Sequence, residues 1–167
     1  MIERLHQLTE RYRTAGIVVD TNLFMLFLVG RYDPRRVSTF KRTSRYSIED
    51  FEFLNLILEP FHHVITTPHI LAEISNLSGT AGGHFDRRYF VSLKSHIAQA
   101  TEVYLPAQTL LDKREYETYG LTDTGILYTA IGEYAVLTDD LPLYVQLDIS
   151  GVDALNFTQL KQSYFLD

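Results

Sequence analysis

Short, unbroken runs of aliphatic residues constrain the fold of this chain most strongly. The first run, residues 16–20, reads Gly-Ile-Val-Val-Asp. A strand without polar alternation is typical of burial on both faces, as in a parallel sheet. Similar runs occupy residues 63–66 and 134–138, and a further strand is predicted at 152–157.

Segments with helical spacing of apolar residues separate these runs. They predict helices over residues 22–29, 48–58, 68–77, 85–100 and 122–131. The third of these segments opens with Thr67 before Pro68, a pairing of N-cap and first-turn proline that helices favour. Strands that alternate with helices predict an α/β domain whose central sheet is mainly parallel.

Length and composition predict a single folded domain over residues 1–167. A chain of 167 residues, 46% of them hydrophobic, can bury a full core and is not expected to be disordered. The stretch 79–83 is the best loop candidate but is too short to link two domains. No apolar run is long enough to cross a membrane, and the N-terminus does not resemble a signal peptide. The absence of cysteine excludes disulfides, thiolate nucleophiles and zinc–thiolate sites, and fits a cytoplasmic protein.

The charge of the chain is unevenly distributed. Its net charge is -6, yet the segment 31–45 contains six cations and only one acid, Asp33. The cations are Arg31, Arg35, Arg36, Lys41, Arg42 and Arg45. Two interpretations are open: a solvated surface, or a clamp for RNA phosphates beside an acidic centre. Tyr32 and Tyr46, which lie among these cations, are candidates for stacking on unpaired bases.

Carboxylates follow two of the predicted strands. Asp20 ends the strand at 16–20, and Asp139 and Asp140 follow the strand at 134–138. The carboxyl ends of parallel strands share one edge of a sheet, where ligands collect, so these acids are expected to lie together. The alternative for each is a helix cap, because Asp after a strand often caps the next helix.

Two further acids lie on predicted helices. Glu73 borders the apolar stripe that includes Ile70 and Ile74, so it is expected to be partly buried and to need a partner. Asp123 shares a face with Ile126, although a place in the first helical turn would also explain it through the helix dipole.

If these acids converge, their mutual repulsion calls for a cation. With no cysteine and no evident histidine cluster, oxygen ligands favour Mg²⁺ or Mn²⁺. Such ions acidify a bound water and polarise phosphoryl oxygens, which is what phosphodiester hydrolysis requires.

Four short segments, in order along the chain, resemble the motifs of PIN domains. They are residues 17–22 (Ile-Val-Val-Asp-Thr-Asn), 67–74 (Thr-Pro-His-Ile-Leu-Ala-Glu-Ile), 121–127 (Leu-Thr-Asp-Thr-Gly-Ile-Leu) and 136–140 (Val-Leu-Thr-Asp-Asp). Each motif is short, but together they span nearly the whole chain. The resemblance implies a three-layer α/β/α sandwich around a parallel sheet.

The resemblance also implies a Mg²⁺- or Mn²⁺-dependent ribonuclease, often endonucleolytic. It assigns metal binding to four acids: Asp20, Glu73, Asp123 and Asp140. Asn22 and Thr138 are implied as supporting residues that orient ligands or water, and Asp139 is a rival or neighbour of Asp140. Many small members of the family are toxins, so an antitoxin protein and a second copy of the chain join RNA as candidate partners. The segment 30–60 is longer than in the smallest toxin-like members.

Other classes fit less well. A haloacid-dehalogenase-like phosphatase needs a second Asp two residues after Asp20, but Asn22 stands there. No glycine motif for nucleotide phosphates is present. A PIN-like scaffold that binds RNA or protein without cleavage is the non-enzymatic alternative. His69, at i−4 from Glu73, is expected to serve packing or hydrogen bonding rather than catalysis.

Overall fold

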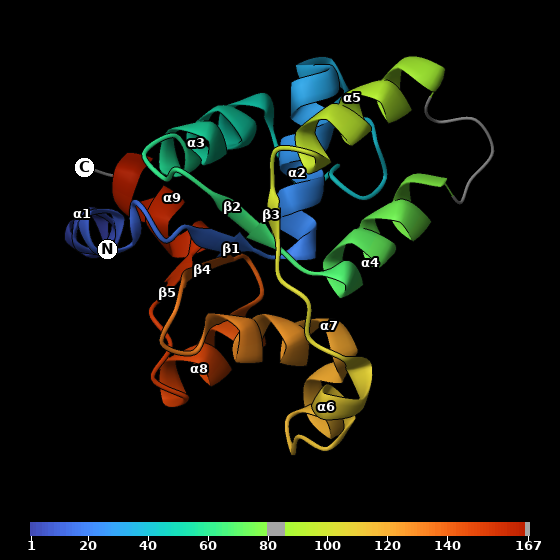
Figure 1. The fold of residues 1–167 in the computed structure, drawn as a ribbon. Helices are drawn as coiled ribbons and strands as arrows, with labels where there is room; N and C mark the ends of the chain where they lie inside the picture. Colours follow the sequence, from blue (N-terminus) through green and yellow to red (C-terminus); the bar gives the residue numbers. More distant parts are fainter. Residues whose placement is uncertain (80–85, 166–167) are drawn as a thin grey trace.

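The computed structural model describes residues 1–79 and 86–165. Five parallel strands form its central sheet in the order β3-β2-β1-β4-β5 (Figure 1). Their bounds are β1 Ile17–Val19, β2 Val64–Thr66, β3 Thr101–Glu102, β4 Ala135–Thr138 and β5 Ala154–Asn156. The four predicted strands are confirmed. The edge strand β3 was not predicted, because its two residues are exposed and carry no apolar signal.

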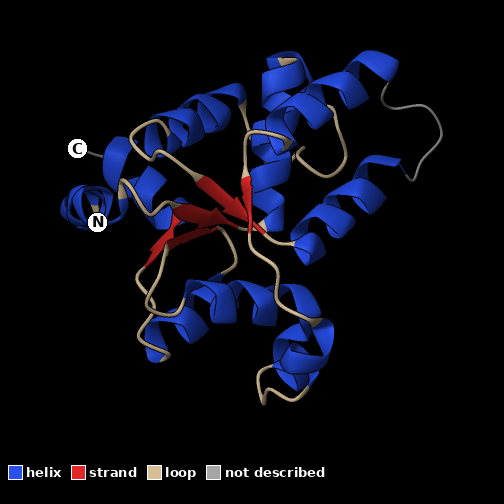
Figure 2. Cartoon of the chain, in the orientation of Figure 1, coloured by secondary structure: helices blue, strands red, loops and turns tan. Residues whose placement is uncertain are grey.

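Helices cover both faces of the sheet, which gives the predicted three-layer α/β/α arrangement (Figure 2). The helices are α1 Ile2–Tyr12, α2 Thr21–Tyr32, the 3₁₀ turn η1 Pro34–Arg36, α3 Ile48–Leu58, α4 Pro68–Gly79, α5 Arg87–Ile97, α6 Ala107–Leu111, α7 Tyr116–Ala130, α8 Leu141–Ile149 and α9 Phe157–Phe165. In Figure 1, α2, α3 and α5 lie on one side of the sheet, and α7 and α8 lie on the other. No helix in the described ranges is both long enough and apolar enough to cross a membrane.

The predicted helices are present with small differences at their ends. The helix expected at 85–100 is α5, which begins after its cap Asp86; residue 85 lies outside the described ranges, as do residues 80–83 of the predicted loop. The helix expected at 122–131 is the second half of α7. The backbone of Gly120 has φ 74° and ψ -175°, which interrupts α7 so that it resumes at Leu121. Glycine adopts this positive φ without the steric penalty that other residues carry.

Helix α2 lies at the centre of the core, and its apolar side chains face every direction. Leu23, Leu26 and Val29 are among its fully buried residues, because the sheet and neighbouring helices surround it. Gly30 lies directly against α3: a Cβ atom built at Gly30 would come 2.2 Å from the Phe51 ring.

Gly30→Ala is therefore expected to destabilise the fold. The added methyl group forces Phe51 and α3 away from α2, and overpacking of this kind costs about 1–3 kcal/mol. Thermal unfolding in EDTA measures the loss. Gly79→Ala is the matched control, since no atom lies within 4 Å of a Cβ built there. Equal melting temperatures for the two variants would contradict this account of the α2–α3 packing.

Candidate active site

Asp20 is the buried centre of the carboxyl edge of the sheet. It follows β1 and caps α2, with one carboxylate oxygen accepting from the Leu23 N–H at 2.8 Å. Its other oxygen accepts from the Thr138 hydroxyl and from the Asp139 N–H. Only 3% of Asp20 is exposed. Burial raises the pKa of Asp20, and the three hydrogen bonds oppose that rise.

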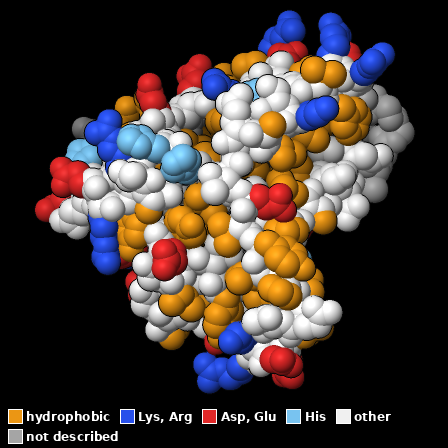
Figure 3. Space-filling model, in the orientation of Figure 1, with side chains coloured by type: hydrophobic (Ala, Val, Ile, Leu, Met, Phe, Trp, Pro, Cys, Tyr) orange, Lys and Arg blue, Asp and Glu red, His pale blue; other side chains and the backbone are white. Residues whose placement is uncertain are grey.

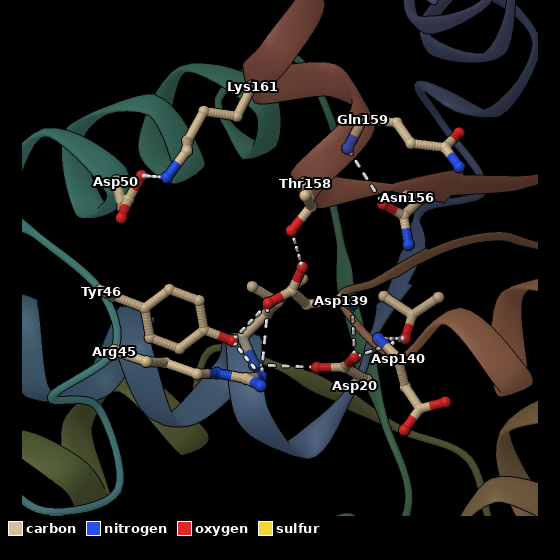
Figure 4. A network of polar contacts seen from close by, with 12 residues as sticks. Asp20, Arg45, Tyr46, Asp50, Asp139, Asp140, Asn156, Thr158, Gln159 and Lys161 are labelled. Carbon is tan, nitrogen blue, oxygen red and sulfur yellow. Dashed lines mark hydrogen bonds and ion pairs between the residues drawn. The ribbon is translucent and has the colours of Figure 1, made fainter.

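The neighbours Asp139 and Asp140 have different environments. Asp140 caps α8 through the Leu143 N–H at 2.9 Å and lines a pocket beside Asp20. The Asp139 side chain does not line that pocket. It accepts hydrogen bonds from Tyr46 and Thr158, and in Figure 4 these contacts lie on the side away from the Asp140 carboxylate. The structure thus places Asp140, and not Asp139, with the other acids.

Glu73 and Asp123 approach the same pocket from two helices. Glu73, on α4, accepts a hydrogen bond from the Thr21 hydroxyl at 2.9 Å. Its expected partial burial is wrong: Ile70 and Ile74 are buried as predicted, but Glu73 is exposed at the rim.

Asp123, on α7, is half-buried. Burial and the negative charges of Asp140, Asp20 and Glu73 raise the pKa of Asp123 to about 7. The carboxylates are therefore close enough for each to disfavour ionisation of Asp123.

The four predicted acids line one hollow of about 190 Å³. Its lining consists of Asp20, Thr21, Asn22, Glu73, Asp123, Asp140 and Leu143. The supporting residue Asn22 is exposed at the rim, whereas Thr138 is fully buried behind Asp20. A larger hollow of about 400 Å³ lies around Phe27 and Phe61 and contains none of these acids, so it lacks the chemistry predicted for the site.

The donor atoms of this pocket suit a hard divalent cation. In residues 1–79 and 86–165, no three His, Asp or Glu side chains are arranged to hold a metal ion as they stand. The hydrogen bonds explain this: Asp20 and Asp140 point oxygens at backbone N–H groups, and Glu73 is held by Thr21. A cation would offset the repulsion that raises the pKa of Asp123, and carboxylate and amide oxygens are the ligands that Mg²⁺ and Mn²⁺ prefer. The chemistry of these donor atoms therefore fits such an ion, which their present hydrogen-bonded positions do not yet surround.

The basic segment does not form a single cluster. All six cations are exposed, and Figure 3 shows Lys and Arg side chains gathered at the end of the molecule where α5 lies. Arg31 stacks over Phe27, and Arg35 pairs with Asp33 at 3.0 Å. Arg31 lies in the last turn of α2 and Arg35 in η1, just after that helix; α2 has 12 residues and is about 18 Å long, and Asp20 caps its other end. Arg45 instead reaches the carboxyl edge of the sheet and pairs with Asp139 at 3.3 Å.

Three side chains near the pocket have contacts that the sequence did not predict. Tyr46 is only 4% exposed and donates its hydroxyl to Asp139, so its expected role in stacking on bases is wrong. Thr21 holds Glu73, and its place beside Asp20 in the Asp-Thr-Asn motif was the available signal. The Thr158 hydroxyl donates a hydrogen bond to the Asp139 carboxylate, and no sequence motif indicated this contact.

His69 lies at the contact between α4 and α7. Its Nδ1 is buried without a hydrogen-bond partner among the described residues, close to Gly125 of α7.

Comparison of the chain with known protein families finds no matching family, and searches of curated proteins and of solved structures find no significant match. The resemblance to PIN domains is therefore carried by the four motifs, their order and the positions of their acids.

Proposed function

We propose that this protein is a divalent-metal-dependent ribonuclease that cleaves RNA internally. One observation carries the proposal: four acids from four separate elements line one pocket at the carboxyl edge of a parallel sheet. Burial and the charges of the other three acids raise the pKa of Asp123, and perturbed pKa values of this kind cluster at functional sites.

Each residue has a distinct part in this proposal. Asp20, Glu73, Asp123 and Asp140 would hold the ion. When bound, Mg²⁺ or Mn²⁺ supplies Lewis acidity toward the phosphoryl group and a water acidified for attack. Thr138 fixes the Asp20 carboxylate by its hydroxyl, and that hydroxyl also accepts the Asp140 N–H at 3.0 Å. Asn22, exposed at the rim, presents an amide that can orient water or a phosphate oxygen.

Single-stranded RNA labelled at either end tests the proposal. With purified protein and Mn²⁺, we expect internal fragments, and EDTA in excess should stop their formation. Matched single-stranded DNA and duplex RNA define the substrate class.

Intact RNA in the presence of protein that binds Mn²⁺ would contradict the enzyme and favour the binding scaffold. Mononucleotide products alone would contradict internal cleavage.

A further inference from the structure

Resting on the proposed function, we infer that Arg45 binds an RNA phosphate beside the cleaved bond, and that Asp139 and Tyr46 fix its position. The inference concerns a basic side chain whose contacts lead to the acidic pocket through Asp139.

The segment that carries Arg45 is anchored to the core. Thr43 is fully buried, and its hydroxyl donates to the Val37 carbonyl at 2.7 Å. Val37 and Phe40 are also buried, and Tyr46 follows Arg45 directly. Buried residues on both sides of Arg45 therefore fix its backbone, so it does not belong to a freely solvated loop.

Asp139 joins Arg45 to the centre of the site. Its side chain is 7% exposed and accepts the Tyr46 hydroxyl at 2.9 Å, while its backbone N–H donates to Asp20 at 2.8 Å. Figure 4 shows Arg45 and Tyr46 reaching Asp139 from one side and Thr158 from another. Asp139 thus links the guanidinium to Asp20, whose negative charge also acts directly on Arg45.

Arg45 keeps donors available for a ligand. Its contacts with Tyr46 and Asp139 both use Nη2, and its guanidinium lies 4.8 Å over the Tyr46 ring. The side chain is 55% exposed. A planar guanidinium has five N–H donors, so those of Nη1 and of Nε remain for single hydrogen bonds to a phosphate oxygen while Nη2 stays anchored.

Stability alone does not explain Arg45. Asp139 already accepts hydrogen bonds from Tyr46 and Thr158, one on each oxygen. An ion pair with one half-exposed partner contributes little to folding. A pocket of four acids, however, repels a polyanion, and a fixed cation at its edge offsets that repulsion for the nearest phosphate.

Fluorescence anisotropy with a labelled single-stranded RNA tests the inference, in EDTA so that binding is measured apart from cleavage. Arg45→Gln should raise the Kd about 10-fold and reduce the salt slope by about 0.7, the value for one phosphate contact on a single strand. Arg35→Gln is the matched control: it removes a more exposed arginine, paired with Asp33, and should change the Kd less than twofold.

Two conservative variants separate position from charge. Arg45→Lys should recover the salt slope but only part of the affinity, because an ammonium lacks the planar set of donors that can hold Asp139 and bind a phosphate at the same time. Tyr46→Phe should weaken binding about threefold and leave the salt slope unchanged, because it frees the guanidinium without removing its charge. All four variants should unfold within about 2 °C of the wild type.

The inference is overturned if Arg45→Gln and Arg35→Gln change the Kd and the salt slope equally, or if the wild-type protein does not bind the RNA. It is also overturned if Arg45→Gln lowers the melting temperature by clearly more than about 2 °C, because the loss of binding would then follow from loss of the fold. Cleavage assays distinguish this from failure of the proposed function. If the wild type cleaves RNA and Arg45→Gln has the same kcat/KM, the inference is rejected and the proposed function stands. If the wild type does not cleave RNA but Arg45→Gln binds RNA more weakly than the wild type, the nuclease is rejected and Arg45 remains an RNA contact.

Discussion

Asp20→Asn is expected to reduce metal-dependent RNA cleavage by roughly 100-fold or more, because it removes a negative charge from the buried centre of the cation site. The substitution keeps the shape of the side chain, so the fold should persist. Calorimetric titration with Mn²⁺ should show a matching loss of affinity in the same preparation. Circular dichroism and thermal unfolding measure whether the fold is retained.

The structure predicts a small net effect of this substitution on stability. The new amide group must face either Leu23 N–H or Asp139 N–H, and two donors that face each other lose a hydrogen bond worth about 1 kcal/mol. The removal of a buried charge, whose pKa is raised by burial, acts in the opposite direction.

Asp148→Asn is the matched control for Asp20→Asn. Asp148 is an exposed acid on α8, the helix that Asp140 caps, and it does not line the pocket. It should retain wild-type cleavage and Mn²⁺ affinity. More than a tenth of wild-type activity in Asp20→Asn, with the control equally active, would place the catalytic centre elsewhere or reveal a contaminating nuclease.

The sequence predicted the strands well where they lie inside the sheet and are buried on both faces. Strands β1, β2 and β4 lie inside the sheet and so consist of unbroken apolar runs, and the prediction of a parallel sheet followed from them. The edge strand β3 has two exposed residues, and only its pairing with β2 makes it a strand. The short helix α6 likewise depends on packing against α7 rather than on a pattern of its own.

The sequence predicted which strands and helices carry the site, but not the directions in which its side chains point. Asp20 and Asp140 were found because the carboxyl ends of parallel strands share an edge. The different directions of Asp139 and Asp140 depend on Tyr46, which is 93 residues away from Asp139 in the chain. Glu73 is exposed at the pocket that α4 and α7 share. Spacing within one helix does not contain this information.

Asp123 should make Mn²⁺ binding depend on pH near neutrality. The pKa of Asp123 is raised to about 7 in the metal-free fold, so below that pH it carries a proton that the ion must displace. Affinity should therefore rise about tenfold per pH unit up to pH 7 and then level off. Calorimetry between pH 5.5 and 8.5 measures this, and a flat profile would show that Asp123 is already ionised beside its neighbours.

The same shift makes the metal-free fold less stable as pH rises. The folded protein retains the proton of Asp123 up to about pH 7, whereas the unfolded chain loses it near the ordinary aspartate pKa of 3.8. Between those values the folded state binds more protons, so the free energy of unfolding falls with increasing pH. Asp123→Asn removes the ionisable group and should stabilise the metal-free protein at pH 8, on the order of 2 kcal/mol after solvent screening of a half-buried group.

Thermal unfolding in EDTA at pH 5.5 and pH 8 measures this effect, with Asp148→Asn as the control. The variant should already be more stable than the wild type at pH 5.5, by about half of the difference at pH 8, because pH 5.5 lies about midway between the pKa values of the unfolded and folded states. Saturating Mn²⁺ should reverse the order at pH 8, because only the wild type gains the full free energy of metal binding. A variant that is more stable without metal and less stable with it would identify Asp123 as a charge that the fold maintains for its ligand. Asp123→Asn that is destabilising in EDTA at both pH values would instead show that Asp123 serves the structure.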